Sequence, residues 1–140
     1  MATHLRAIDH TTELTREWVR DLDRLLDWSD EPRALRLLRV TLQAVRDWLD
    51  VNEAAQLGAQ LPLLVRGLYY ESWRPAKTPV EDRSREAFLG RIDEAFSTDP
   101  VNTTEAACAV FRLLNNHVSR GEIEDVRNRM PKAIRDIWPL

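Results

Sequence analysis

The amino-acid sequence predicts an all-α fold, a compact helical bundle made of two tandem copies of a three-helix unit. Apolar residues recur every three or four positions through most of the chain, which is the spacing of one face of an α-helix. Glycine and proline, which interrupt helices, number only 4 and 7 among 140 residues. The chain also resembles itself when it is displaced by 69 residues. We therefore expect one domain over residues 1–140, with six or more helices packed by pseudo-twofold symmetry.

The internal repeat is defined by matched positions along an ungapped stretch. Residues 38–69 align with residues 107–138 at the offset of 69. Pro62 then matches Pro131, and an arginine follows each proline four positions later. A one-residue slip in the preceding loop joins the earlier parts of the two copies. The two copies and the linker between them are expected at about 9–73, 78–139 and 69–78.

The first helix of each copy is expected over Thr12–Trp28 and over Pro79–Phe96. The earlier helix carries its apolar side chains on one face, at Leu14, Trp18, Leu22, Leu25 and Leu26. The later helix has signals typical of an N-terminus. Thr78 suits the N-cap, Pro79 suits the first helical position, and Glu81 completes a capping box.

The second helix of each copy is the most apolar part of the chain. It is expected over Pro32–Leu49 in the first copy and over Thr104–Val118 in the second. Leucine and valine recur on one face of the first, and alanine, valine, leucine and phenylalanine on one face of the second. This pattern predicts that the two helices form the centre of the core.

The third helix of each copy has signals at both ends. Asp50 and Ser119 are good N-cap residues, and each is followed three positions later by a glutamate that can complete a capping box. Pro62 and Pro131 lack a backbone N–H and clash with the preceding turn, so the helix should break at each of them. A short final helix is expected after each proline.

The linker between the copies is rich in aromatic residues, namely Tyr69, Tyr70 and Trp73. Aromatic side chains are enriched at the hot spots of protein interfaces, but they also fill the seams between packed units. Two interpretations therefore stay open. The three side chains lie in an internal seam between the copies, or they form a surface for a partner or for self-association.

Several stretches of the chain resemble one bacterial protein family. They are residues 58–73, which include the Leu-Pro pair, His117–Val126, Met130-Pro131 and Ile137–Pro139. Through them the chain is similar, over about residues 10–139, to the family called domain of unknown function 2267. The resemblance implies a compact helical bacterial protein. It supplies no established activity, cofactor or catalytic residue.

No metal site is predicted from the sequence. The Glu-x-x-His spacing of di-iron bundles is absent at all three histidines, His4, His10 and His117. The last of them aligns with Trp48, which favours a structural histidine at the end of a core helix. The acidic residues of segment 122–125 could bind a cation, but acidic side chains are favoured in the first turn of a helix, and Glu122 is explained as a capping residue.

Catalytic and cofactor-binding residues are not predicted either. Cys108 aligns with Arg39, and His117 follows on a different helix face, so the sequence pairs the thiol with no base. The four glycines are isolated, and neither a phosphate-binding loop nor a Gly-x-Ser-x-Gly elbow is present. We therefore expect a protein that is not an enzyme and needs no cofactor.

A polar stripe on the second helix combines Gln43 with three arginines, Arg36, Arg39 and Arg46. Such a stripe could contact phosphates, but the second copy lacks it and the chain has a net charge of −3. We interpret it as a solvated helix face, which makes nucleic acid an unfavoured partner.

These observations favour a non-enzymatic protein-interaction or self-association module, either a homodimer or a complex with a protein partner. The alternatives are a weak nucleic-acid-binding or regulatory protein that uses the arginine stripe and, third, an enzyme of unknown type. We infer no small-molecule ligand. No apolar run reaches the length of about 18 residues that spans a membrane. One cysteine and no signal-like apolar segment favour the cytoplasm.

Overall fold

The computed structural model describes residues 5–140, and this part of the chain holds eight α-helices, one short 3₁₀ helix and no strand. The predicted all-α class is therefore confirmed. The helices are α1 (Arg6–Leu26), α2 (Glu31–Trp48), α3 (Val51–Ala59), α4 (Leu63–Tyr70), η1 (Pro75–Lys77), α5 (Arg85–Ala95), α6 (Thr103–His117), α7 (Arg120–Arg129) and α8 (Lys132–Arg135).

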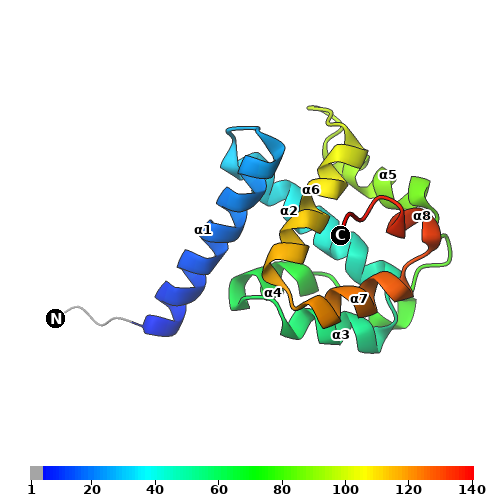
Figure 1. Cartoon of the computed structure of the whole chain (residues 1–140), viewed down its shortest axis with the longest axis horizontal. Helices are drawn as coiled ribbons and strands as arrows, with labels where there is room; N and C mark the ends of the chain where they lie inside the picture. Colours follow the sequence, from blue (N-terminus) through cyan, green and yellow to red (C-terminus); the bar gives the residue numbers. More distant parts are fainter. Residues whose placement is uncertain (1–4) are drawn as a thin grey trace.

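Helices α2 and α6 cross in the middle of the bundle (Figure 1). Helix α1 packs against both of them on one side, and α5 packs against both on the other side (Figure 1). Helices α3 and α7 lie side by side at one end of the bundle (Figure 1). The first turns of α1 project away from the rest of the molecule.

The hydrophobic core is centred on α2 and α6, as the sequence predicts. These two helices contribute more buried residues than any other helices, among them Leu38, Leu42 and Phe111. The ring of Phe111 stacks on Trp138, with 4.1 Å between ring centroids, so the C-terminal segment is part of the same core. No helix of residues 5–140 is long and apolar enough to cross a membrane.

The predicted ends of the third helices are also confirmed. The side chain of Asp50 accepts a hydrogen bond from the backbone N–H of Glu53 at 2.9 Å, and Ser119 accepts one from Glu122 at 3.3 Å. Both prolines break the chain direction and become the N-cap residues of short helices. Their backbone angles match closely, with φ −57° and ψ 152° at Pro62 and φ −58° and ψ 152° at Pro131.

The predicted start of α5 is wrong. The helix begins at Arg85, not at Pro79, and its N-cap is Ser84, whose side chain accepts from the N–H of Ala87. The Thr78 hydroxyl donates to the Pro75 carbonyl instead of capping a helix. The backbone N–H of Val80 donates to the Asp47 carbonyl at 2.9 Å. This contact with α2 holds the segment outside a helix, and no local signal reports it.

The predicted start of α1 is late by six residues. The helix begins at Arg6, whereas the sequence places it at Thr12. Residues 6–11 contain neither glycine nor proline, so nothing interrupts the helical backbone there. The N–H groups of Ile8 and Asp9 both donate to the Leu5 carbonyl and close the first turn.

Candidate functional site

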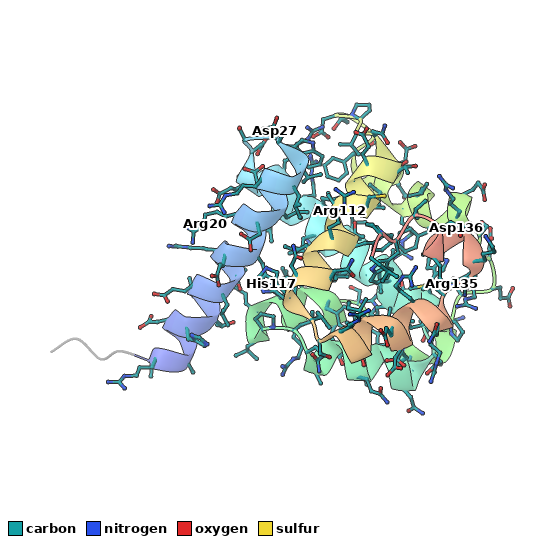
Figure 2. The ribbon with its side chains drawn as sticks, in the orientation of Figure 1. Arg20, Asp27, Arg112, His117, Arg135 and Asp136 are labelled. Atoms are coloured by element: carbon teal, nitrogen blue, oxygen red, sulfur yellow. The ribbon has the colours of Figure 1, made fainter. Side chains whose placement is uncertain are left out.

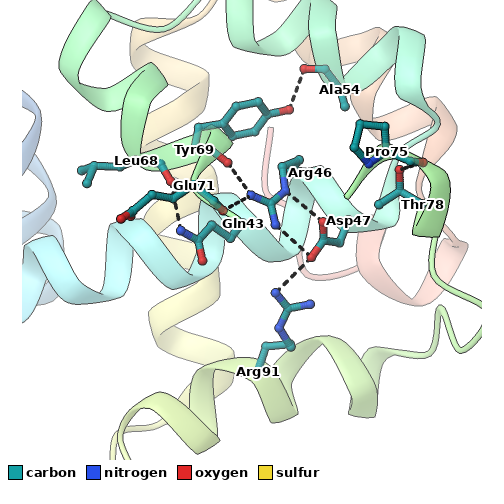
Figure 3. Close-up of polar contacts among 10 residues, drawn as sticks. All are labelled: Gln43, Arg46, Asp47, Ala54, Leu68, Tyr69, Glu71, Pro75, Thr78 and Arg91. Carbon is teal, nitrogen blue, oxygen red and sulfur yellow. Dashed lines mark hydrogen bonds and ion pairs between the residues drawn. The ribbon is translucent and has the colours of Figure 1, made fainter. Parts of the chain in front are cut away.

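The guanidinium of Arg46 lies at the centre of a buried polar network near the end of α2 (Figure 3). The residue is 3% exposed. One terminal nitrogen, Nη1, donates to the carbonyl oxygens of Tyr69 and Glu71, each at 2.8 Å. The Nε atom donates to the carboxylate of the adjacent Asp47 at 2.9 Å. The network therefore fixes the end of α4, where the carbonyls would otherwise lack donors.

The carboxylate of Asp47 balances two guanidinium groups. Its second oxygen lies 3.2 Å from Arg46 Nη2 and 3.1 Å from Arg91 Nη2 on α5 (Figure 3). Gln43, one turn earlier on α2, donates its side-chain amide to the Leu68 carbonyl at 3.0 Å (Figure 3). Helices α2, α4 and α5 are thus joined through side chains that are buried at Arg46 and partly buried at Gln43, Asp47 and Arg91.

The predicted solvated arginine stripe is therefore wrong at Arg46. The other two arginines are exposed but already paired. Arg39 lies 2.8 Å from the Glu71 carboxylate. Arg36 pairs with Asp99, and its guanidinium lies 4.2 Å from the centre of the Phe96 ring. The stripe consequently offers no row of free arginine side chains along α2.

The aromatic group of the linker lies against the core. Tyr69 is fully buried, and its hydroxyl donates to the Ala54 carbonyl at 2.7 Å (Figure 3). Burial raises the pKa of this hydroxyl. Tyr70 and Trp73 are half-buried, and their ring centroids are 5.2 Å apart. A Cβ atom at Gly58 would lie only 2.7 Å from Cζ of Tyr70, so the ring packs directly on the backbone of α3.

Two glutamates meet where α3 and α7 lie side by side. Glu53 is 1% exposed and Glu122 is 8% exposed. One carboxylate oxygen from each, together with one from the exposed Asp125, lies within 4.8 Å of the others. The Oε2 atoms of both glutamates are buried and accept no hydrogen bond. The arrangement brings like charges together, and the two glutamates of the cluster are buried.

One guanidinium faces this carboxylate cluster. Nη2 of Arg129 lies 3.8 Å from Glu53 Oε1, while its Nη1 atom is 2.6 Å from Asp50. Burial and the neighbouring carboxylate of Glu53 raise the pKa of Glu122 to about 8. A carboxyl group with this pKa keeps its proton near neutral pH unless a bound metal cation takes the place of the proton.

The sequence analysis missed this cluster because it explained the two glutamates by capping alone. Their backbone N–H groups are indeed capped, but their side chains turn inward, toward each other. A signal was present in the sequence. Glu53 aligns with Glu122 at the offset of 69, and matched positions that lie at the axis meet when two units pack around a twofold axis.

His117 and Cys108 have structural partners. The His117 side chain comes from the end of α6 and faces α1 (Figure 2). Its Nε2 atom lies 2.9 Å from the Asp21 carboxylate, and its ring stacks on Trp18 with 4.6 Å between centroids. The Cys108 thiol donates to the Ile137 carbonyl, and burial raises its pKa. Of the other histidines, His10 is exposed on α1 and His4 lies outside the described residues.

A cleft of about 540 Å³ opens between the end of α1 and the N-terminal half of α6. Its lining is mixed, with Trp28 and Leu26 on one part and charged side chains such as Arg33, Glu105 and Arg112 on another. Arg112 lies on the outer face of α6 (Figure 2). The cleft is distinct from both the Arg46 network and the carboxylate cluster.

Comparison with known proteins identifies the family. Residues 15–137 match the family described as Uncharacterized conserved protein (DUF2267). The chain belongs to the DUF2267 family. This confirms the resemblance seen in the sequence, over nearly the same residues. None of the curated proteins matches the chain.

Proposed function

We propose that this DUF2267 protein is a non-enzymatic protein-interaction or self-association module. The observation that carries the proposal is a group of exposed apolar side chains where α1 and α4 begin. We call it the apolar edge, and it consists of Leu5, Ile8, Leu63 and Leu64. The N–H of Leu64 donates to the hydroxyl of Thr11 at 3.0 Å, which ties the start of α4 to α1 one turn beyond Ile8.

The position of the apolar edge favours an interaction with another polypeptide. The first turns of α1 project from the bundle, so a second helix could pack along them (Figure 1). An exposed apolar group of this kind on a small protein is typical of an interaction surface. We propose a second copy of the chain as the partner, because the same edge on two copies would make a self-complementary interface.

Light scattering after size-exclusion chromatography at micromolar concentration tests the proposal. The wild-type chain should have the mass of a dimer, and Ile8→Asp combined with Leu64→Asp should have the mass of a monomer. Leu25→Asp is the matched control, because Leu25 is also exposed on α1 but lies near its opposite end. A wild-type monomer that also captures no partner would contradict the proposal.

We also propose that the chain is a tandem repeat folded around a pseudo-twofold axis. Reciprocal contacts support it. Arg129 contacts Asp50, and Gln60 accepts from the Ser119 backbone N–H, so positions 69 apart exchange roles across α3 and α7. Within each copy an arginine donates to a carbonyl five residues earlier, Arg66 to Leu61 and Arg135 to Met130.

Nucleic-acid binding through the arginine stripe receives less support. Arg46 is buried, and both other arginines of the stripe are already paired with carboxylates. Binding to phosphates would have to break these pairs. A binding assay at about 50 mM salt tests the alternative, since phosphate contacts strengthen as salt falls. Absence of binding at this salt concentration would rule out nucleic-acid binding.

The setting of the protein is likewise a proposal. A bacterial cytoplasm is supported by the single free cysteine, which suits a reducing compartment. The family resemblance and the predominance of arginine over lysine agree with a bacterial source. Labelling of Cys108 in intact cells with a membrane-permeant thiol reagent, but not with an impermeant one, would agree with this location.

A further inference from the structure

We propose that Glu53, Glu122 and Asp125 form a binding site for one divalent cation between α3 and α7. The inference is independent of the apolar edge and of self-association. It departs from the expectation of no metal site, because the sequence could not show that these side chains face one another.

The first argument is convergence. The three carboxylates come from two helices, and each offers one oxygen within 4.8 Å of the other two. A cation between them would have three oxygen ligands without any change of helix position. The oxygens at 2.0–2.6 Å from Mg²⁺ or Ca²⁺ are about 3–4 Å apart, so only small side-chain rotations are needed.

The second argument is that two oxygens lack partners in a place where partners are needed. Oε2 of Glu53 and Oε2 of Glu122 are buried and accept no hydrogen bond, and Glu53 has a side-chain exposure of only 1%. A buried carboxylate without a partner is unfavourable, because it has lost its hydration. A cation bound between the carboxylates would supply a positively charged partner to both glutamate side chains.

The third argument is charge. Arg129 is the cation that faces the cluster, and it is shared with Asp50, whose carboxylate it contacts more closely. Three carboxylates therefore face part of one guanidinium. A dication would neutralise the remaining charge and would lie closer to the three carboxylates than Arg129, which is 3.8 Å from Glu53.

The chemistry of the ligands selects the class of cation. Carboxylate oxygens are hard ligands, and neither a histidine nor a cysteine belongs to the cluster. Mg²⁺, Mn²⁺ and Ca²⁺ prefer such ligands, while Zn²⁺ sites usually contain nitrogen or sulfur. Asp125 is exposed, so water can complete the coordination on that side. The site would join α3 to α7 and thereby the two halves of the chain.

The competing occupant is a proton shared by the two glutamates. A shared proton would also relieve the repulsion, and it needs no metal. The two occupants make different predictions. A cation needs Asp125 as well as both glutamates, and it is removed by a chelator. A proton between Glu53 and Glu122 needs neither Asp125 nor any added ion.

Titration with Mn²⁺ at pH 7.5 tests the proposal on the full chain after treatment with EDTA. Electron paramagnetic resonance counts the bound Mn²⁺, and melting curves report its effect on stability. We expect one Mn²⁺ per chain, displacement by excess Mg²⁺ or Ca²⁺, and a higher melting temperature with the ion. Glu122→Gln and Asp125→Asn should each weaken binding at least about tenfold.

Glu124→Gln is the matched control, because Glu124 is an exposed acidic residue on the same helix and pairs with Arg120. It should bind Mn²⁺ within about twofold of the wild type. Asp125 is exposed, and Asp125→Asn leaves the buried pair of glutamates unchanged. Weaker binding by this variant would therefore reflect the loss of a ligand and not a folding defect. Circular dichroism of each variant verifies the helical fold.

Two results would overturn the proposal. One is the absence of stoichiometric Mn²⁺ binding by the folded wild-type chain, which would leave a shared proton as the occupant. The other is Mn²⁺ binding that Asp125→Asn and Glu122→Gln leave unchanged. Neither result bears on self-association, which is measured without added metal.

Discussion

The molecule buries charge in two regions in opposite ways. Around Arg46, every charged or polar group of the network has a partner of opposite character, and the carbonyls at the end of α4 receive donors. Between α3 and α7, two carboxylates face each other, and two of their oxygens have no partner. Arg46, Glu53 and Glu122 are all buried, so the difference between them lies in pairing and not in burial.

This difference separates structure from candidate function. A buried charge whose partners are complete holds helices together and leaves nothing for a ligand to add. A buried pair of like charges reduces stability unless a proton or a cation lies between them. The Arg46 network is thus explained by the fold alone, whereas the carboxylate cluster is the region for which we propose an occupant.

The largest expected effect tests the Arg46 network. Arg46→Met should lower the free energy of unfolding by about 3–5 kcal/mol, because it leaves Asp47 and two carbonyls partly unpaired in the interior. Urea unfolding measures it. Arg39→Met is the control, since this exposed arginine on the same helix pairs with Glu71, and such a pair contributes about 0.2–1 kcal/mol. Equal effects of Arg46→Met and Arg39→Met would show that the buried network contributes no more to stability than an exposed ion pair.

The second prediction has the opposite sign and concerns pH. The pKa of Glu122 rises from its usual 4.5 to about 8 in the folded protein, so the folded chain holds a proton that the unfolded chain has released. Without divalent cations, the stability that this proton provides is complete below about pH 4.5 and is lost as pH rises toward 8. Glu53, Asp125 and Arg129 are the charged groups that face this carboxyl.

Glu122→Gln in EDTA should therefore flatten the loss of stability that we expect of the wild type between pH 5 and 8. At pH 8 the variant should be more stable than the wild type by roughly 1–3 kcal/mol, which is the usual cost of an unsatisfied buried polar group. Urea unfolding at several pH values measures it. A variant with the same pH profile as the wild type would place the titrating group elsewhere.

The third prediction asks whether charge or position makes Arg46 important. Asn115 holds the matching position on α6, at the offset of 69, and it uses a neutral amide. It accepts from Trp138 Nε1 at 2.8 Å and donates to the Pro139 carbonyl. Asn115→Ala should cost about 1–2 kcal/mol, less than Arg46→Met, because no charge is left unpaired. A larger cost for Asn115→Ala in urea unfolding would contradict the role assigned to charge.

The smallest effect tests whether the two glutamates occupy equivalent places. They lie in α3 and α7, which end shortly before Pro62 and Pro131, and these two prolines have nearly the same backbone angles. Pro62→Ala and Pro131→Ala should each lower stability by about 0.4–1 kcal/mol, since both give the unfolded chain more freedom. Melting curves should show nearly equal shifts. Clearly different shifts would argue against the proposed tandem repeat and against equivalent positions for the two glutamates.

The sequence by itself determined the helical class, the central helices and most helix ends of this protein. These features depend on neighbours in the chain. Asp50 and Ser119 cap the residues that follow them, and the two prolines stop a helix through their own rings. The same reasoning located the core in α2 and α6, because helical periodicity places apolar residues on one face.

Only the tertiary structure decided which polar residues are buried and what they meet. The sequence predicts Arg46 to be part of an exposed stripe, but α4 and α5 pack over it in the structure. Helix α5 begins later than predicted because the backbone N–H of Val80 donates to a carbonyl of α2. The sequence explains Glu53 and Glu122 as capping residues, whereas the packing of α3 on α7 brings their carboxylates close together. Such contacts join residues far apart in the chain, and the spacing of residues along a helix does not specify them.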